Sequence, residues 1–198
     1  MKLVLATQNP KKLNEMNEIL SHLGVEVVSE AELGVRIEVE ETGDTFTDNA
    51  RLKATAVMQA TGLPAVADDS GLCVDALNGG PGVYSARFGG EGLDDKGRYT
   101  LLLEMLRGQT DRAAHFHTSI VCAFPNGDEL VCEGECPGTI AFAPMGEGGF
   151  GYDPVFFVPE LRKTFGQLTA EEKASVSHRG KALRAFAAAL DDYLKGNE

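Results

Sequence analysis

The stretch KLVLATQNPKKLNEMNEILSHLGVEVVS, residues 2–29, decides the fold class of this chain. Residues 2–6 form a short apolar run that predicts a buried strand, and a polar turn over residues 7–12 follows it. Leucine and methionine then recur at helical spacing until Gly24, and residues 25–29 alternate as a second strand. The order strand, helix, strand predicts an α/β sheet with a right-handed crossover.

The rest of the chain continues this alternation. Thr45 and Asp48 predict a capped helix that ends at Gly62. Further helices are expected over residues 93–107, from residue 170 and from residue 177, and further strands over residues 64–67, 72–76, 113–124, 129–135 and 155–158. Because no linker or internal repeat interrupts the pattern, we expect one α/β domain with a mixed sheet over residues 1–198.

Composition excludes several classes of protein. Hydrophobic residues make up 43% of the chain and charged residues 24%, which fits a globular domain. The 30 acidic and 18 basic residues give a net charge of −12, which repels nucleic acid and anionic membranes. No apolar run reaches the roughly 18 residues that cross a bilayer, and the apolar start is too short for a signal peptide. We therefore expect a cytoplasmic protein with no nucleic-acid or membrane partner, and its four cysteines as reduced thiols.

Two adjacent carboxylates, Asp68 and Asp69, follow the short strand predicted over residues 64–67. Ligands bind at the carboxyl ends of strands in open α/β sheets, and a divalent cation relieves the repulsion between neighbouring carboxylates. The hydroxyl group of Ser70 could hold a phosphate oxygen. The alternative interpretation is an acidic turn without a ligand.

A second acidic pair, Glu40 and Glu41, precedes the helix that starts near Thr45. By itself this pair is typical of a solvated loop. If Glu41 faces Asp69 in space, the two carboxylates could share one cation with substrate phosphates, which is the usual arrangement for magnesium.

The few basic residues occupy places that suit anion binding. Lys11 and Lys12 lie at the start of the first helix, where free N–H groups already favour an anion. Lys53 lies one helical turn after Asn49, on the same face. Lys173, His178 and Arg179 cluster near the ends of two helices. The alternative for each is an exposed surface cation.

Residues 146–151 match the pattern GxGxxG, but we reject a dinucleotide site because a strand rather than a helix follows them. We interpret this segment as a loop that presents Phe150 and Asp153. An aromatic ring can stack on a base, and a carboxylate can accept from a ring N–H. The alternative is a glycine-rich turn with Phe150 in the core. His115 and His117 lie on one strand face, but we favour a structural or surface role because no third ligand is evident.

Six motifs together resemble the inosine/xanthosine triphosphate pyrophosphatase family, the house-cleaning enzymes that remove deaminated purine nucleotides. They are TQNPKK at residues 7–12, ETGDTF at 41–46 with NA at 49–50 and KA at 53–54, ADDSGL at 67–72, PGVYSAR at 81–87, GGFGYDP at 148–154 and SHR at 177–179. The resemblance runs from residue 2 to about residue 194. It implies a homodimer and an elongated mixed β-sheet with two lobes that flank an active-site cleft. It also implies Mg²⁺-dependent hydrolysis of ITP, dITP and XTP to the monophosphate and pyrophosphate.

The resemblance also assigns roles to single residues. It implies that Glu41, Asp69 and Asp68 hold the metal and that Asp69 is the catalytic proton acceptor. The substrate-binding residues that it implies are Thr7, Gln8, Asn9, Pro10, Lys11, Lys12, Lys53, Ser70, Phe150, Gly151, Tyr152, Asp153, Lys173, His178 and Arg179. Two alternatives stay open at this point: a pyrophosphatase for modified pyrimidine or methylated nucleotides, and a nucleotide sensor without catalysis.

Overall fold

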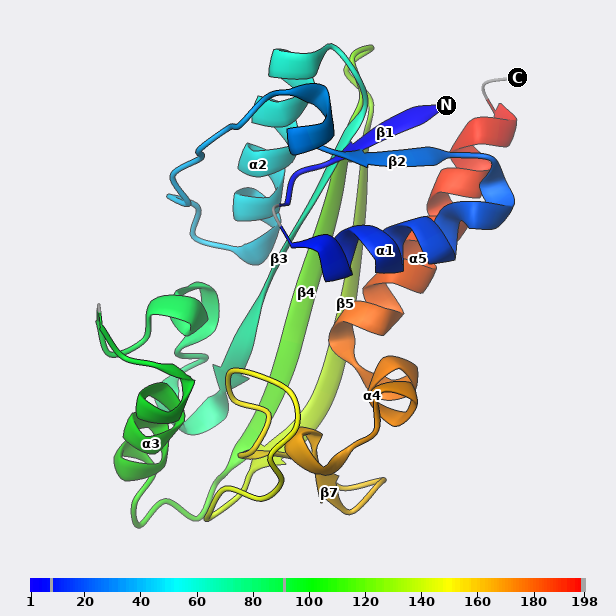
Figure 1. The fold of residues 1–198 in the computed structure, drawn as a ribbon. Helices are drawn as coiled ribbons and strands as arrows, with labels where there is room; N and C mark the ends of the chain where they lie inside the picture. Colours follow the sequence, from blue (N-terminus) through cyan, green and yellow to red (C-terminus); the bar gives the residue numbers. More distant parts are fainter. Residues whose placement is uncertain (8, 91, 197–198) are drawn as a thin grey trace. The chain divides into compact units, whose positions relative to one another are not determined.

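The computed structural model describes residues 1–7, 9–90 and 92–196. Figure 1 shows its elements, which are β1 (Lys2–Leu5), α1 (Pro10–Leu20), β2 (Glu26–Ser29), α2 (Phe46–Thr61), β3 (Ala65–Val74), α3 (Asp95–Met105), β4 (Ala113–Ala123), β5 (Glu129–Ile140), β6 (Phe156–Val158), β7 (Lys163–Thr164), α4 (Ala170–Val176) and α5 (His178–Gly196). The first three are the strand, helix and strand that residues 2–29 predict.

The strands form one sheet in the order β2-β1-β3-β4-β5-β6-β7. β1 pairs in parallel with β2 and with β3, so that Val4 lies opposite Val28 on one side and Ala65 on the other. β6 pairs antiparallel with β5 and with β7. The sheet is therefore mixed, which confirms the predicted α/β class.

Local signals in the sequence set the ends of the helices. The Thr45 hydroxyl group accepts from the Asp48 N–H at 3.1 Å, which caps the start of α2. Gly62 ends the same helix with a φ of 69°, a left-handed conformation that favours glycine. Thr169 and Glu172 form a capping box at the start of α4, the helix expected from residue 170.

The chain divides into two compact units. The first unit holds Met1–Asp69, Thr118–Gly134 and the chain from Lys181 onward, and the second unit holds Ser70–His117 and Glu135–Gly180. β3, β4 and β5 each contribute residues to both units, because each of these strands crosses a boundary between the ranges.

The first unit has helices on both faces of its strands. On one face, α1 and α5 pack against side chains such as Leu3 and Leu5 (Figure 1). On the other face, α2 packs its alanines and Val57 against residues such as Val4 and Ala67. Alternate residues of a strand point to opposite faces, so the apolar run of β1 serves both cores. Each fully buried leucine of this kind contributes about 1.5–3 kcal/mol.

Asp68 and Asp69 lie inside a strand rather than in a turn. The sequence predicts two separate short strands, over residues 64–67 and 72–76, with the acidic turn between them as an alternative interpretation, whereas β3 runs without interruption from Ala65 to Val74. β3 lies between β1 and β4 in the sheet. β1 pairs with β3 only at Ala65 and Val66, so β4 is the neighbouring strand that can keep the acidic segment extended against the turn preference of Asp, Ser and Gly.

An aromatic cluster forms the centre of the second unit. The rings of Phe116 and Phe165 are stacked with centroids 5.6 Å apart, and the Phe156 ring meets Phe116 edge-on at 4.7 Å. Leu102 and Leu106, at the C-terminal end of the α3 segment, pack into the same core. This cluster anchors the strands and loops that carry the glycine-rich segment.

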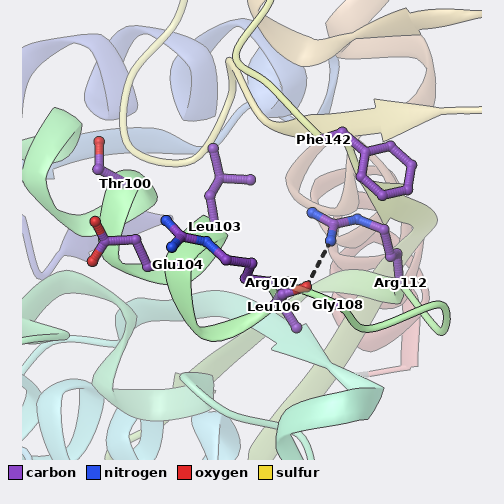
Figure 2. A pocket seen from close by; sticks show the side chains of 8 residues that line it. All are labelled: Thr100, Leu103, Glu104, Leu106, Arg107, Gly108, Arg112 and Phe142. Carbon is purple, nitrogen blue, oxygen red and sulfur yellow. Dashed lines mark hydrogen bonds between the residues drawn. The ribbon is translucent and has the colours of Figure 1, made fainter.

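Arg112 connects the end of α3 to the end of β5 in the second unit. Its guanidinium group donates to the carbonyl oxygens of Leu106 at 3.1 Å, Ile140 at 2.6 Å and Ala141 at 2.8 Å. Figure 2 shows it beside the exposed ring of Phe142, whose centroid lies 4.4 Å away. The surrounding pocket measures about 370 Å³ and is lined by none of the predicted site residues. We therefore assign Arg112 a structural role.

The four cysteines are free thiols, and three of them, Cys122, Cys132 and Cys136, are buried. Burial raises the pKa of the Cys122 thiol, so it stays protonated at neutral pH. Across residues 1–7, 9–90 and 92–196, no helix combines the length and hydropathy that a membrane span needs.

Candidate functional site

The loop between β1 and α1 combines a helix N-terminus with a pocket in the first unit. Asn9 is the N-cap residue of α1, and its side chain accepts from the Lys11 N–H at 3.0 Å. Thr7, Asn9 and Pro10 line a pocket of about 340 Å³. A helix N-terminus favours an anion through its free N–H groups and its dipole. Gln8 lies outside the described residues.

Lys12 and Asp68 form an ion pair. The Lys12 ammonium group lies 2.8 Å from Asp68 Oδ2, and the aspartate side chain is only 3% exposed. A buried carboxylate needs a charged partner of this kind. In the structure the Asp68 carboxylate pairs with Lys12, and its role as a metal ligand stays a prediction.

Lys53 brings together the two acidic segments that lie far apart in the sequence. Its ammonium group donates to Glu41 Oε1 at 2.8 Å, to the Asp68 carbonyl oxygen at 2.9 Å and to Asp69 Oδ1 at 3.4 Å. Glu41 and Asp69 therefore face the same point from different segments of the chain. This arrangement meets the condition that the sequence left open for a shared cation site.

These contacts also change how the groups titrate. Burial raises the pKa of Asp69, and the charge of Glu41 adds to this effect, whereas Lys53 and a hydrogen bond from Asn49 oppose it. Burial alone would lower the pKa of Lys53, but the neighbouring carboxylates outweigh it and raise this pKa. Lys53 is therefore charged at neutral pH, and Asp69 is a stronger base than an exposed aspartate.

The donor set of Glu41 and Asp69 suits Mg²⁺, since carboxylate oxygens are the ligands that this ion prefers. In the part of the chain that the structure describes, no three His, Cys, Asp or Glu side chains form a cluster that could hold a metal by themselves. Magnesium sites in phosphate-processing enzymes commonly use one or two carboxylates and complete the shell with water and phosphate oxygens. A pair of carboxylates is therefore sufficient for that type of site.

The glycine-rich loop of the second unit exposes the ring of Phe150, which is 76% exposed. Lys173 lies over this ring, with its nitrogen 4.7 Å from the centroid. The alternative that placed Phe150 in the core is therefore wrong. An exposed ring beside a cation offers a face on which a planar base can stack.

Asp153 is buried rather than presented by the loop, which corrects the sequence-based expectation. Its side chain is 4% exposed, and Oδ2 accepts from the Phe150 N–H at 2.9 Å and forms an ion pair with Lys173. A Cβ on Gly149 would collide with the same oxygen, so only glycine permits this approach. Asp153 therefore holds the loop and Lys173 in place.

Tyr152 is also buried, and its hydroxyl group donates to the Ser85 carbonyl oxygen at 2.8 Å. Burial raises its pKa to about 12, so the hydroxyl group remains a donor at neutral pH. The next contact is made by Gly151, whose N–H donates to Asp95 Oδ2 at 2.7 Å. These two contacts fix the end of the loop that follows Phe150.

His178 and Arg179 begin α5, directly after the buried Ser177. The His178 ring stacks on Phe116 with centroids 4.7 Å apart and an angle of 12° between the planes. Its orientation is therefore set by the aromatic cluster. Ser70, on β3, has an exposed side chain.

Comparison with known proteins places this chain among its relatives. The sequence profile of the Ham1 family matches residues 3–189. The chain belongs to the Ham1 family. It is 50% identical over 196 residues to a dITP/XTP pyrophosphatase of Exiguobacterium, with 99% of this chain and 100% of the relative covered. A dITP/XTP pyrophosphatase of Thermus thermophilus is 53% identical over 194 residues, with 97% and 93% covered.

Solved structures give the same result. A HAM1 protein of Coxiella burnetii superimposes with a TM-score of 0.93 at 43% identity, covering 97% of this chain and 99% of that one. The Ham1 protein of Staphylococcus aureus superimposes with a TM-score of 0.91 at 41% identity, covering 100% of both chains. The fold described above is therefore the Ham1 fold.

Sequence reasoning assigned no role of their own to several residues that shape the site of this Ham1 family member. Asp95 and Ser85 support the glycine-rich loop, and Arg36 lines the pocket beside Thr7. Asn49 contacts Asp69. A signal existed for Asn49 alone, because it is a polar residue on the apolar face of a helix. Asp95 begins α3, and Ser85 and Arg36 lie outside the α-helices and strands; only the tertiary structure determines the partners of these three residues.

Proposed function

We propose that this chain hydrolyses the deaminated purine nucleotides dITP, ITP and XTP to the nucleoside monophosphate and pyrophosphate, which keeps them out of DNA and RNA. The observation that carries the proposal is the convergence of Glu41 and Asp69 on the Lys53 ammonium group, at 2.8 Å and 3.4 Å. Relatives named dITP/XTP pyrophosphatase that match nearly the full chain support the choice of substrate class.

The triphosphate would be bound by residues of the first unit. Thr7 to Lys12 would contribute the N-terminus of α1, the Asn9 side chain and two lysines, and Lys53 would add a third cation. These groups matter because the chain carries a net charge of −12 and would otherwise repel a nucleotide. The role of Gln8 stays a prediction.

Glu41 and Asp69 would hold Mg²⁺, and Asp68 would act beside them by fixing Lys12. When bound, the ion supplies positive charge that stabilises the transferring phosphoryl group. Lys53 already contacts both carboxylates, so it would lie next to the phosphates that complete the site. Direct ligation of the ion by Asp68, the third predicted ligand, stays a prediction.

Asp69 would accept the proton of the attacking water. The water oxygen bonds to the α-phosphorus, the bond from this phosphorus to the α–β bridging oxygen breaks, and pyrophosphate leaves with the electron pair. Positioning of the water and neutralisation of the phosphate charge contribute the rest of the rate acceleration.

The purine base would be recognised by residues of the second unit. Phe150 offers an exposed ring for stacking, and His178, Arg179 and Lys173 carry N–H donors for the 6-oxo group of hypoxanthine and xanthine. Adenine has an amine at that position and would leave a donor unpaired. Gly151, Tyr152 and Asp153 would keep the loop in position, and Ser70 would contact the substrate.

We further propose a homodimer in which each chain is one two-lobed domain, acting in the cytoplasm. Light scattering on the purified protein measures its oligomeric state, and a monomer at micromolar concentration would contradict the proposed homodimer.

One experiment tests the proposed activity: release of pyrophosphate from dITP, ITP, XTP, GTP and ATP, measured with Mg²⁺ and then with a chelator. We expect turnover of the first three nucleotides with Mg²⁺ and its loss with chelator. Tight binding of ITP without product would indicate a sensor, and a preference for modified pyrimidine nucleotides would indicate the other enzyme class.

A further inference from the structure

We infer that Asn49 is a positioning residue that holds the Glu41 segment and Asp69 in register for binding a divalent cation. The inference rests on the proposed function, since it concerns the same pair of carboxylates. Asn49 lies near the start of α2, on the face that also carries Phe46 and Ala50, and it is 0% exposed. A buried amide costs free energy unless its polar atoms have partners.

The partners of Asn49 determine which way its amide group points. Oδ1 accepts from the Gly43 N–H at 2.8 Å. A backbone N–H can only donate, so the atom that faces Gly43 must be the oxygen. The amide nitrogen then points to the other side, where it donates to Asp69 Oδ2 at 3.3 Å. One side chain thus connects the two acidic segments of the site.

Gly43 makes the first of these contacts possible. A Cβ on Gly43 would lie 2.7 Å from the Asp48 Cβ and 2.8 Å from Asn49 Oδ1, which is closer than such atoms approach. The loop that carries Glu41, two residues earlier, therefore lies directly against the first turn of α2. A side chain at residue 43 would move this loop away from Asn49.

Asn49 and Lys53 together fix both oxygens of Asp69. Asn49 donates to Oδ2, and Lys53, one helical turn further along α2, lies 3.4 Å from Oδ1. Lys53 also contacts Glu41, whose loop Asn49 holds through Gly43. A single helix therefore sets the distance and the rotation of two carboxylates from separate segments. Preorganised ligands bind a cation more tightly than mobile ones.

Isothermal titration of the purified protein with MgCl₂, in the absence of nucleotide, tests the inference. Asn49→Leu keeps the branched shape of the side chain but removes both hydrogen bonds. We expect it to weaken Mg²⁺ binding by about tenfold to a hundredfold, the range for losing a hydrogen bond to a charged group. Gly43→Ala should also weaken Mg²⁺ binding, because the added Cβ moves the loop away from Asn49 while the Asn49 side chain itself is kept. With dITP as substrate, both variants should lower kcat more than they change KM.

Thr47→Val is the matched control, because Thr47 lies on the same helix but its hydroxyl group lies within hydrogen-bond distance, 2.9 Å, of Ser119 and Glu133 rather than of Asp69. We expect a lower melting temperature with Mg²⁺ affinity within about twofold of the wild type, a difference too small to reflect a lost hydrogen bond. The inference is overturned if Asn49→Leu behaves like this control, or if the wild type binds no Mg²⁺. A wild type that binds Mg²⁺ but does not hydrolyse dITP would contradict the proposed function while the titrations still decide the role of Asn49.

Discussion

The ammonium group of Lys12 lies 2.8 Å from a carboxylate oxygen of Asp68, and the two side chains are 33% and 3% exposed. The lysine therefore reaches solvent while the aspartate does not. A partly exposed cation that neutralises a buried carboxylate can serve the fold and still be available to a ligand. The same pattern recurs in the second unit, where the 23% exposed Lys173 pairs with the 4% exposed Asp153.

Replacing Lys12 should therefore destabilise the protein as well as impair triphosphate binding. Lys12→Met leaves the Asp68 charge buried without its partner, and we expect a loss of about 1–3 kcal/mol in the free energy of unfolding. Urea denaturation measures this loss. Lys11→Met is the control, because Lys11 is exposed on the same turn of α1. Equal stability of the two variants would show that the ion pair does not contribute.

Replacing Asp69 should separate catalysis from nucleotide binding. Asp69→Asn removes the proton acceptor but keeps the shape of the side chain, so we expect kcat to fall by about 10²–10⁴-fold. Nucleotide affinity, measured by titration with dITP in chelator, should change much less, because the lysines and the β1–α1 loop remain. Asp44→Asn, at an exposed position in the neighbouring loop, should keep normal turnover. Near-normal turnover of the Asp69 variant would exclude Asp69 as the base.

The sequence predicts the ends of the helices well because their signals are local. Thr45 and Gly62 set the limits of α2 through contacts within a few residues. The path of β3 was predicted wrongly for the opposite reason. Its Asp-Asp-Ser-Gly segment has the composition of a turn, yet it is extended as part of β3, which has β4 as a neighbouring strand. Strand preference depends on the neighbours in the sheet, which the sequence does not specify.

In the candidate site, too, some features could be predicted from the sequence and others depend on contacts between distant segments. The residues alone left open whether Glu41 faces Asp69, and only the family resemblance implied a shared site with Lys53 nearby. The structure brings the three side chains into contact. The partners of Asp68 and Asp153 could not be predicted, because any nearby lysine would satisfy a buried carboxylate equally well. Which lysine does so depends on distances between segments that are far apart in the sequence.

The selectivity for 6-oxo purines should depend on Arg179. If its guanidinium group donates to the 6-oxo group, Arg179→Ala should reduce the preference for ITP over ATP by about tenfold to a hundredfold. The ratio of kcat/KM for the two nucleotides measures this effect. Arg107→Ala, at a pocket in the second unit that is lined by no predicted site residue, should leave the ratio unchanged. An unchanged ratio in the Arg179 variant would assign the recognition to another donor.

The stability of the protein should depend on pH through Asp153. Burial raises its pKa in the folded state, although Lys173 opposes the shift. Between the unfolded value of about 3.9 and the raised folded value, the folded protein therefore binds more protons than the unfolded chain. The free energy of unfolding must then fall as pH rises through this window. The stabilising contribution of Asp153 is fully present below the window and lost above it.

Asp153→Asn removes this titration. The free energy of unfolding of the wild type relative to the variant should therefore decrease as pH rises from about 4 and become constant above the folded pKa. Each unit by which the folded pKa exceeds the unfolded one changes this difference by about 1.4 kcal/mol. Loss of the ion pair with Lys173 adds a constant to the difference in the free energy of unfolding between the two proteins. This constant does not affect how the difference changes with pH. Urea denaturation at several pH values measures it, with Glu160→Gln, at an exposed position, as the control. A difference that rises with pH would show that the Lys173 charge outweighs the burial of the Asp153 carboxylate.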